Sequence, residues 1–86
     1  MTKHCKIYFS YFGYGIDDVI LCEVCMAKAV DIHHIQYKSR GGKDEIKNLM
    51  ALCRKCHDKT HSEEYKEGEL KLIHGYFMAG VRKRFK

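Results

Sequence analysis

The middle of the chain alternates apolar and polar residues with the period of a β-strand. Within residues 29–35, Val30 and Ile32 fall on one face of such a strand, and His33 falls on the other. His34 shares the face of Val30 and Ile32 if the strand stays regular. Because we expect both histidines to reach one site, we predict that the strand bends at His34.

Three other apolar stretches predict short elements around this strand. Residues 19–21 and 49–52 are brief apolar runs that favour strands, and residues 7–12 are aromatic and β-prone. We therefore expect residues 7–12 to form a strand or an extended arm packed on the core. A platform on which exposed bases stack is the alternative interpretation of the same aromatic residues.

Helical spacing dominates the C-terminal part of the chain. One helix is expected to begin near Cys53 and to carry His57 and His61 on one face. Ser62 resembles the N-cap of a further helix. Beyond it, apolar residues expected to face the core recur at helical spacing: Leu70, Ile73, Phe77, Met78 and Val81. Two glycines within this stripe weaken the helix by about 1 kcal/mol each, which favours an early end.

Length and composition limit the possible classes of protein. The 86 residues form one domain, residues 1–86, whose thin core would benefit from a metal or disulfides. No apolar run approaches the roughly 18 residues of a membrane span, and no signal peptide is apparent, so we expect a cytoplasmic protein. The formal net charge of +5 suits a polyanionic partner. The basic tail, residues 82–86, is either a solvated end or an arm that contacts phosphates.

Four of the five cysteines form two Cys-x-x-Cys pairs, Cys22 with Cys25 and Cys53 with Cys56. Two intervening residues let a tight turn aim both sulfurs at one ion, and two such pairs supply the four ligands of tetrahedral zinc. Such binding contributes on the order of 10–16 kcal/mol to the folding of zinc-finger peptides. We predict a structural zinc site, with redox-active dithiols or disulfides as the alternative. Cys5 has no partner at metal spacing and is interpreted as a free thiol.

Four of the six histidines and one asparagine form a second constellation: His33, His34, Asn48, His57 and His61. One imidazole from the strand and one or two from the helix can hold a divalent metal with positions open for phosphate. The other strand histidine can take a proton from water, and the asparagine can orient that base through its carbonyl. Histidines without a metal are the alternative. We retain that interpretation for His4 and for His74, which we expect at the edge of the core.

At this point the residues resemble the HNH endonuclease family with its ββα-metal, or His-Me finger, fold. The resemblance covers residues 22–61, including Asp31-Ile32-His33-His34-Ile35, Gly41-Gly42, Asn48-Leu49, Leu52-Cys53-Arg54-Lys55-Cys56-His57 and His61. The cysteines are similar to those of small phage and bacterial HNH proteins, and the histidines to those of colicin nucleases. The resemblance implies an α+β domain: a ββα-metal fold stapled by a four-cysteine zinc site, with an N-terminal aromatic strand or arm and a C-terminal helix.

The resemblance also assigns roles residue by residue. His34 corresponds to the general base, and Asn48 to the asparagine of the family's name. The implied ligands of the catalytic metal are His33, His57 and His61, the last being absent from other zinc-knuckle members. Asp31 is either a support for the histidines or an outward-facing strand residue.

The function that this resemblance implies is metal-dependent hydrolysis of DNA, by nicking or cutting the duplex with weak sequence preference. The catalytic ion could be Mg²⁺, Mn²⁺, Ni²⁺ or Zn²⁺. Sequence-independent phosphate contacts are expected from Lys38, Arg40, Lys43, Arg54 and Lys55. A double-strand cut would need two active sites, hence a homodimer or two nicks. The alternatives are a non-catalytic zinc-knuckle module that binds nucleic acid or a protein partner, and an accessory subunit of a larger complex such as phage DNA packaging.

Overall fold

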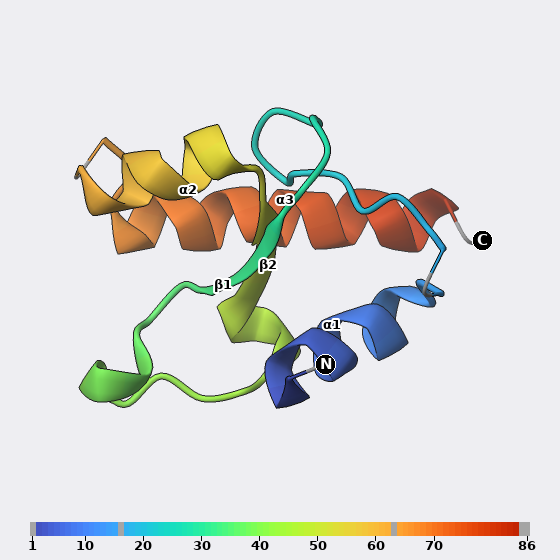
Figure 1. Cartoon of the computed structure of the whole chain (residues 1–86), viewed down its shortest axis with the longest axis horizontal. Coiled ribbons are helices and arrows are strands. Elements are labelled where there is room, and N and C mark those ends of the chain that lie inside the picture. The colour runs from blue at the N-terminus through green and yellow to red at the C-terminus, as the bar shows by residue number, and fades with distance from the viewer. Residues whose placement is uncertain (1, 16, 63, 85–86) are drawn as a thin grey trace.

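An antiparallel strand pair, β1 (Asp31–His34) and β2 (Leu49–Leu52), forms the centre of this small α+β fold (Figure 1). The structure, a computed structural model, describes residues 2–15, 17–62 and 64–84, with side chains through Gly80. The helices are α1 (Lys3–Phe12), α2 (Arg54–His61) and α3 (Glu67–Arg84), and single 3₁₀ turns lie at Lys38–Arg40 and Ile46–Asn48. Residues 31–61 therefore form a strand, a loop, a second strand and a helix, in that order.

The strand β2 divides the core into two layers. It is buried along its whole length, whereas β1 is partly exposed and pairs with it so that His34 lies opposite Leu49. Because side chains alternate along a strand, Leu49 and Ala51 belong to one apolar cluster and Met50 and Leu52 to the other. The short sheet is thus covered on both faces.

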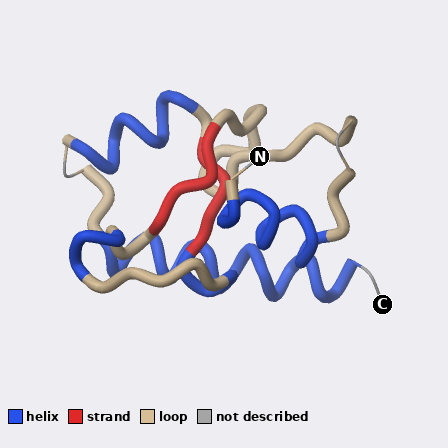
Figure 2. The backbone as a smooth tube through the Cα atoms, turned by 60° about the horizontal axis from the view of Figure 1, so that its bottom comes forward, coloured by secondary structure: helices blue, strands red, loops and turns tan. Residues whose placement is uncertain are grey.

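Helices supply the cover on each face. Tyr8 and Phe12 of α1 pack with the first cluster, and Cys56 of α2 belongs to the second. The long helix α3 runs past both layers (Figures 1 and 2). It contributes Leu70 to the second cluster, and Phe77 packs against the first. One helix therefore ties the two layers together.

The expectation of an aromatic strand or arm at residues 7–12 is wrong, because these residues form most of helix α1. Tyr8 and Phe12, one turn apart, are both buried with their ring centroids 4.6 Å apart. Gly13 ends the helix in the left-handed region at φ 71°, and Tyr14 N–H donates to the carbonyl of Phe9 at 2.9 Å. Packing of an i, i+4 aromatic pair has overridden β-propensity.

The strand predictions are confirmed in part. Residues 49–52 form β2 as expected, but the strand predicted over residues 29–35 is shortened to β1. Residues 19–21 form no strand, and Leu21 makes only an isolated bridge with Lys28. The predicted bend at His34 is wrong, because His34 is still paired within β1.

The helix predictions differ at two boundaries. Helix α2 begins beside Cys53 as expected, but Ser62 caps its C-terminus instead of starting a new helix. Helix α3 does not end early: it continues through Gly75 and Gly80 to Arg84. The side chain of Val81 and the end of the basic tail lie outside the described residues. Within the part of the chain that the structure describes, no helix is long and apolar enough to cross a membrane.

Candidate metal and active site

The four cysteines of the two Cys-x-x-Cys pairs meet beside the hairpin, where β1 begins and β2 ends. Their four sulfur atoms all lie within 4.8 Å of one another, and the Sγ atoms of Cys25 and Cys53 are 3.6 Å apart. Four thiolates bound to one zinc at about 2.3 Å would be about 3.8 Å apart in a tetrahedron. All four are free thiols, and Cys22 and Cys56 are buried. The cluster is consistent with a structural metal such as zinc.

A tight turn and a helix start present these sulfurs. After the first pair, Met26 adopts φ 68° and its N–H donates to the carbonyl of Cys22 at 2.9 Å. At the second, Cys53 is the N-cap of α2, and its Sγ accepts from Cys56 N–H at 3.4 Å. This hydrogen bond lowers the pKa of Cys53 to about 7, whereas burial raises the pKa of Cys56. A thiolate, the form that zinc binds, is thus favoured where the helix begins.

Glu23, inside the first Cys-x-x-Cys pair, anchors the cysteine turn to three other elements. Its Oε2 accepts from the hydroxyl of Tyr8 at 2.5 Å and from Ala51 N–H at 3.2 Å. Its Oε1 lies 2.6 Å from Nδ1 of His74, whose Nε2 lies 2.7 Å from the carbonyl oxygen of Ile46. His74 is 2% exposed, so it is fully inside the core instead of at its edge as expected. This buried network joins the zinc knuckle to α1, β2 and α3.

Three of the predicted metal ligands gather between β1 and α2. The ring centroids of His33 and His57 are 5.1 Å apart, and those of His57 and His61 are 5.0 Å apart. Rings that bind one ion through nitrogens at about 2.1 Å would have centroids about 5 Å apart. The cysteine sulfurs all lie within 4.8 Å of one another, but the ring nitrogens of these three histidines do not. The rings therefore face one region without forming a closed site.

Asp31 supports this histidine group from β1. Its Oδ2 lies 3.0 Å from Nδ1 of His57, an arrangement that fixes the ring and leaves Nε2 directed away for a ligand bond. Of the two interpretations of Asp31, support for the histidines is the one that the structure shows. Burial, followed by the charges of His57 and His61, lowers the pKa of His33 to about 4. His33 is therefore neutral at pH 7, as a metal ligand must be.

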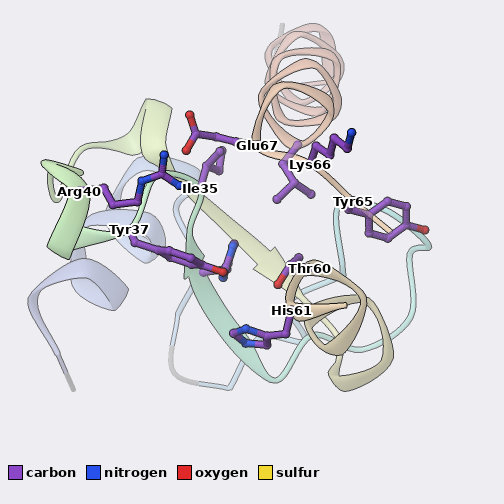
Figure 3. Close-up of a pocket in the computed structure, with 10 residues that line it drawn as sticks. Ile35, Tyr37, Arg40, Thr60, His61, Tyr65, Lys66 and Glu67 are labelled. Atoms are coloured by element: carbon purple, nitrogen blue, oxygen red, sulfur yellow. The ribbon is translucent and has the colours of Figure 1, made fainter. Parts of the chain in front are cut away.

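A pocket of about 520 Å³ opens beside His33 and His61 (Figure 3). Arg40 and Lys66 line it, and the ring of Tyr37 stands edge-on to His33 at 5.9 Å between centroids. The lining thus combines imidazole nitrogens with two cationic side chains and the carboxylate of Glu67. The two cations can attract an anionic group such as a phosphodiester.

His34 lies on the other face of β1, as strand alternation requires. Its Nε2 is 2.7 Å from Oδ1 of Asp44, and its ring centroid is 4.6 Å from that of His4. Lys38 holds the second oxygen of Asp44 at 3.2 Å. The hydrogen bond with His34, aided by Lys38, holds the pKa of Asp44 below its usual range. The structure therefore does not bring His34 onto the face of His33 and the other metal-ligand histidines.

Asn48 closes the loop that follows β1. Its Oδ1 accepts from Gln36 N–H at 2.8 Å, and its Nδ2 donates to the carbonyls of Gln36 at 3.1 Å and Lys43 at 3.0 Å. Gly42 is required in the same loop, because a Cβ there would lie 1.8 Å from the Gln36 oxygen. The expected orientation of the base by the Asn48 carbonyl is not what the structure shows, since that oxygen is engaged by Gln36. Asp44 contacts His34 instead.

The five cations predicted to contact DNA fall at two ends of the hairpin. Lys38, Arg40 and Lys43 belong to the loop between the strands, and Arg54 and Lys55 begin α2 beyond β2. All five are exposed, and Arg40 alone of the five lines the pocket beside His33. One continuous basic surface is therefore not formed by these five residues.

Sequence reasoning missed Asp44 and His4 as neighbours of His34. The sequence spacing of these two residues does not indicate a role near His34. Asp44 is one of several loop carboxylates, and His4 is thirty residues before His34 in the chain. The only available signal was that a loop with Gly41-Gly42 must fold back, which places its later residues near the end of β1. Nothing in the pattern showed that α1 would carry His4 to the same place.

The chain is similar in sequence to a known protein family and to a curated protein. The sequence model of the HNH endonuclease family matches residues 22–63, which contain both Cys-x-x-Cys pairs and His33, His34, His57 and His61. A curated protein named anaredoxin, from Nostoc sp. (strain PCC 7120 / SAG 25.82 / UTEX 2576), is 40% identical over 58 residues, which are 64% of this chain and 70% of the relative. No solved structure shows a significant match. The chain belongs to the HNH endonuclease family.

Proposed function

We propose that this protein is a metal-dependent endonuclease that hydrolyses phosphodiester bonds of DNA, nicking or cutting the duplex. The observation that carries the proposal is the group of His33, His57 and His61 beside a pocket that Arg40 and Lys66 help to line. Asp31 behind His57 is the kind of carboxylate partner that metal-ligating histidines have. Membership of the HNH family supports the same chemistry.

In this proposal the histidine group and His34 act from two sides of one strand. Among the described elements β1 pairs only with β2, so a phosphodiester lying along its other edge can meet both faces. A divalent ion held by His33 and its neighbours would stabilise charge on the phosphate and on the leaving 3′ oxygen. Any of Mg²⁺, Mn²⁺, Ni²⁺ and Zn²⁺ could serve.

His34 is the proposed base. Its Nε2 is engaged by the carboxylate of Asp44, which leaves Nδ1 as the atom that takes the proton from the attacking water. The carboxylate fixes the ring and would stabilise the positive charge that appears on it. General-base catalysis of this kind contributes roughly 10²–10⁴-fold to a rate.

DNA is the proposed partner, held through its phosphates. Arg40 and Lys66 line the pocket next to the histidines. Lys43, Lys47 and Lys71 line a second pocket together with Glu45, between the inter-strand loop and α3. Contacts of this type position the duplex without reading its sequence. We expect binding to weaken steeply as the salt concentration rises.

The test is plasmid cleavage by the purified protein in each of the four divalent metals. His34→Ala should reduce nicking at least about 100-fold while zinc content and melting temperature stay unchanged. His4→Ala is the matched control, because it removes an imidazole from the same face of β1 and should leave nicking intact. Nicking by His34→Ala at the wild-type rate would exclude His34 as the base.

A second candidate is a non-catalytic zinc-knuckle module that binds nucleic acid, alone or inside a larger DNA-processing complex. The position of His34 on the face opposite the other histidines favours it. This candidate predicts salt-dependent DNA binding with no cleavage in any of the four metals. The plasmid assay therefore separates the two.

A further inference from the structure

His4, His34 and Asp44 form a second group of metal-ligating side chains, distinct from both the cysteines and the other histidines. One ligand atom from each lies within 4.8 Å of the other two, a condition that the described residues meet elsewhere only at the four cysteines. The shortest separation is 2.7 Å, between Nε2 of His34 and Oδ1 of Asp44. All three residues are half-buried, so solvent ions can reach them.

Three separate elements hold this group in place. His4 belongs to α1, which packs on β1 through the apolar cluster, and its ring centroid lies 4.6 Å from that of His34. His34 is fixed by strand pairing at the end of β1. Asp44 lies in the loop that Asn48 ties to the strand. The three side chains therefore converge because of tertiary packing and not because they are close in sequence.

The donor set is that of a zinc site with an open coordination position. Two imidazoles and one carboxylate, completed by water, are found in such sites, with bonds of about 2.0–2.2 Å. Ligand atoms around a tetrahedral ion are then about 3.4 Å apart. His34 and Asp44 would separate slightly from 2.7 Å, and His4 would close in from within 4.8 Å.

We propose that His4, His34 and Asp44 bind a divalent transition-metal ion such as zinc, and that this ion switches the nuclease off. The ion would take the place of the Nε2 proton between His34 and Asp44, and the imidazole would carry its proton on Nδ1 instead, by exchange with solvent. Nδ1 of His34 would then carry a hydrogen and have no lone pair with which to accept a proton from water. Binding does not depend on the proposed nuclease function, whereas the inhibition rests on it.

Lys38 sets the affinity of this site. Its Nζ lies 3.2 Å from Oδ2 of Asp44, so a positive charge already neutralises part of the carboxylate. A divalent ion entering beside it is repelled. The site is therefore expected to bind zinc only when the free ion is abundant, as a regulatory site would.

Zinc binding is tested first, by calorimetric titration of the chain already carrying zinc on its four cysteines. His4→Phe keeps the ring contact with His34 but removes both ligand nitrogens. This variant should lose one zinc equivalent, or bind it much more weakly. The loss of affinity should exceed roughly 10–100-fold, which is the cost of losing a residue that only hydrogen-bonds to a metal ligand. Lys38→Met should instead bind several-fold more tightly, because it removes the repelling charge. Equal zinc stoichiometry and affinity in wild type and His4→Phe would overturn the site.

Nicking in Mg²⁺ or Mn²⁺ with added zinc then tests the switch. Wild type and His4→Phe should nick equally without added zinc, and zinc should inhibit wild type but not His4→Phe. Equal inhibition of the two would overturn the switch while leaving the binding result in force. If wild type nicks in no metal, the proposed nuclease function fails, and the calorimetric difference still decides whether the site exists.

Discussion

Loss of Glu23 should damage the fold severely, although Glu23 lies between two cysteines and is not a metal ligand. Its side chain is completely buried, and its two oxygens face Tyr8, Ala51 and His74. Glu23→Ala would leave three buried donors without a partner. Breaking a buried pair of this kind by removing one member costs about 3–5 kcal/mol.

The size of that loss can be compared with the stability available. Domains of this size have a free energy of unfolding of roughly 5–15 kcal/mol, so the Glu23→Ala variant should retain only a small part of it. Tyr8→Phe removes one donor to a charged acceptor and should cost about 1.5–3 kcal/mol. Glu23→Gln retains an acceptor for Tyr8 and Ala51 and can donate to neutral His74. It should therefore be the mildest of the three variants.

Urea unfolding at a fixed free zinc concentration measures these differences, because zinc bound by the folded state adds to apparent stability. The expected order of destabilisation is Glu23→Ala, then Tyr8→Phe, then Glu23→Gln. A loss below about 1 kcal/mol for Glu23→Ala would refute the assignment of this network as a structural anchor. Equal losses for Glu23→Gln and Glu23→Ala would show that the negative charge, and not the hydrogen-bonding pattern, is what matters.

The metal sites and the buried histidine give the remaining predictions. Cys53→Ser should strip zinc and lower the melting temperature, and full zinc occupancy would argue against the cluster. EDTA should stop nicking at lower doses than those that unfold the chain, and simultaneous loss would contradict two separate sites. Asp31→Ala should weaken binding of the catalytic metal about 10–100-fold with circular dichroism unchanged. The fold lowers the pKa of His33 to about 4, so as the pH falls the unfolded chain binds a proton at His33 before the folded protein does. The free energy of unfolding is therefore highest above pH 6.5 and falls as the pH drops from 6.5 toward 4. Between about pH 7 and pH 5 the wild type should lose about 1–2 kcal/mol more than His33→Gln, allowing for partial solvent screening, and parallel pH curves would contradict this.

Sequence spacing was sufficient for the cysteine cluster and for the histidine group on α2. Two residues between cysteines and three between His57 and His61 are local constraints, which a turn and a helix satisfy almost regardless of the rest of the fold. The strand β2 was also predicted from a short apolar run, although a similar run at residues 19–21 forms no strand. Each of these features depends on residues close in sequence.

Spacing failed where a residue's conformation depended on distant packing. Residues 7–12 have strand propensity, yet they form a helix because Tyr8 and Phe12 pack together against β2. The predicted bend at His34 failed because pairing with Leu49 keeps the strand regular to its end. In both cases long-range burial outweighed a local preference, as β-propensity measurements lead one to expect.

By itself the sequence determined the ligand chemistry: which sulfurs can share an ion, which imidazoles lie on one helix face, and that the chain is cationic. Only the tertiary structure decided which groups those side chains meet. It placed Asp31 behind His57, Asp44 and His4 beside His34, and Glu23 against His74 fifty-one positions away. The reason is that ligand identity is a property of single residues and short intervals. Contact between remote segments, by contrast, is set by the packing of α1 and α3 on the two faces of the hairpin.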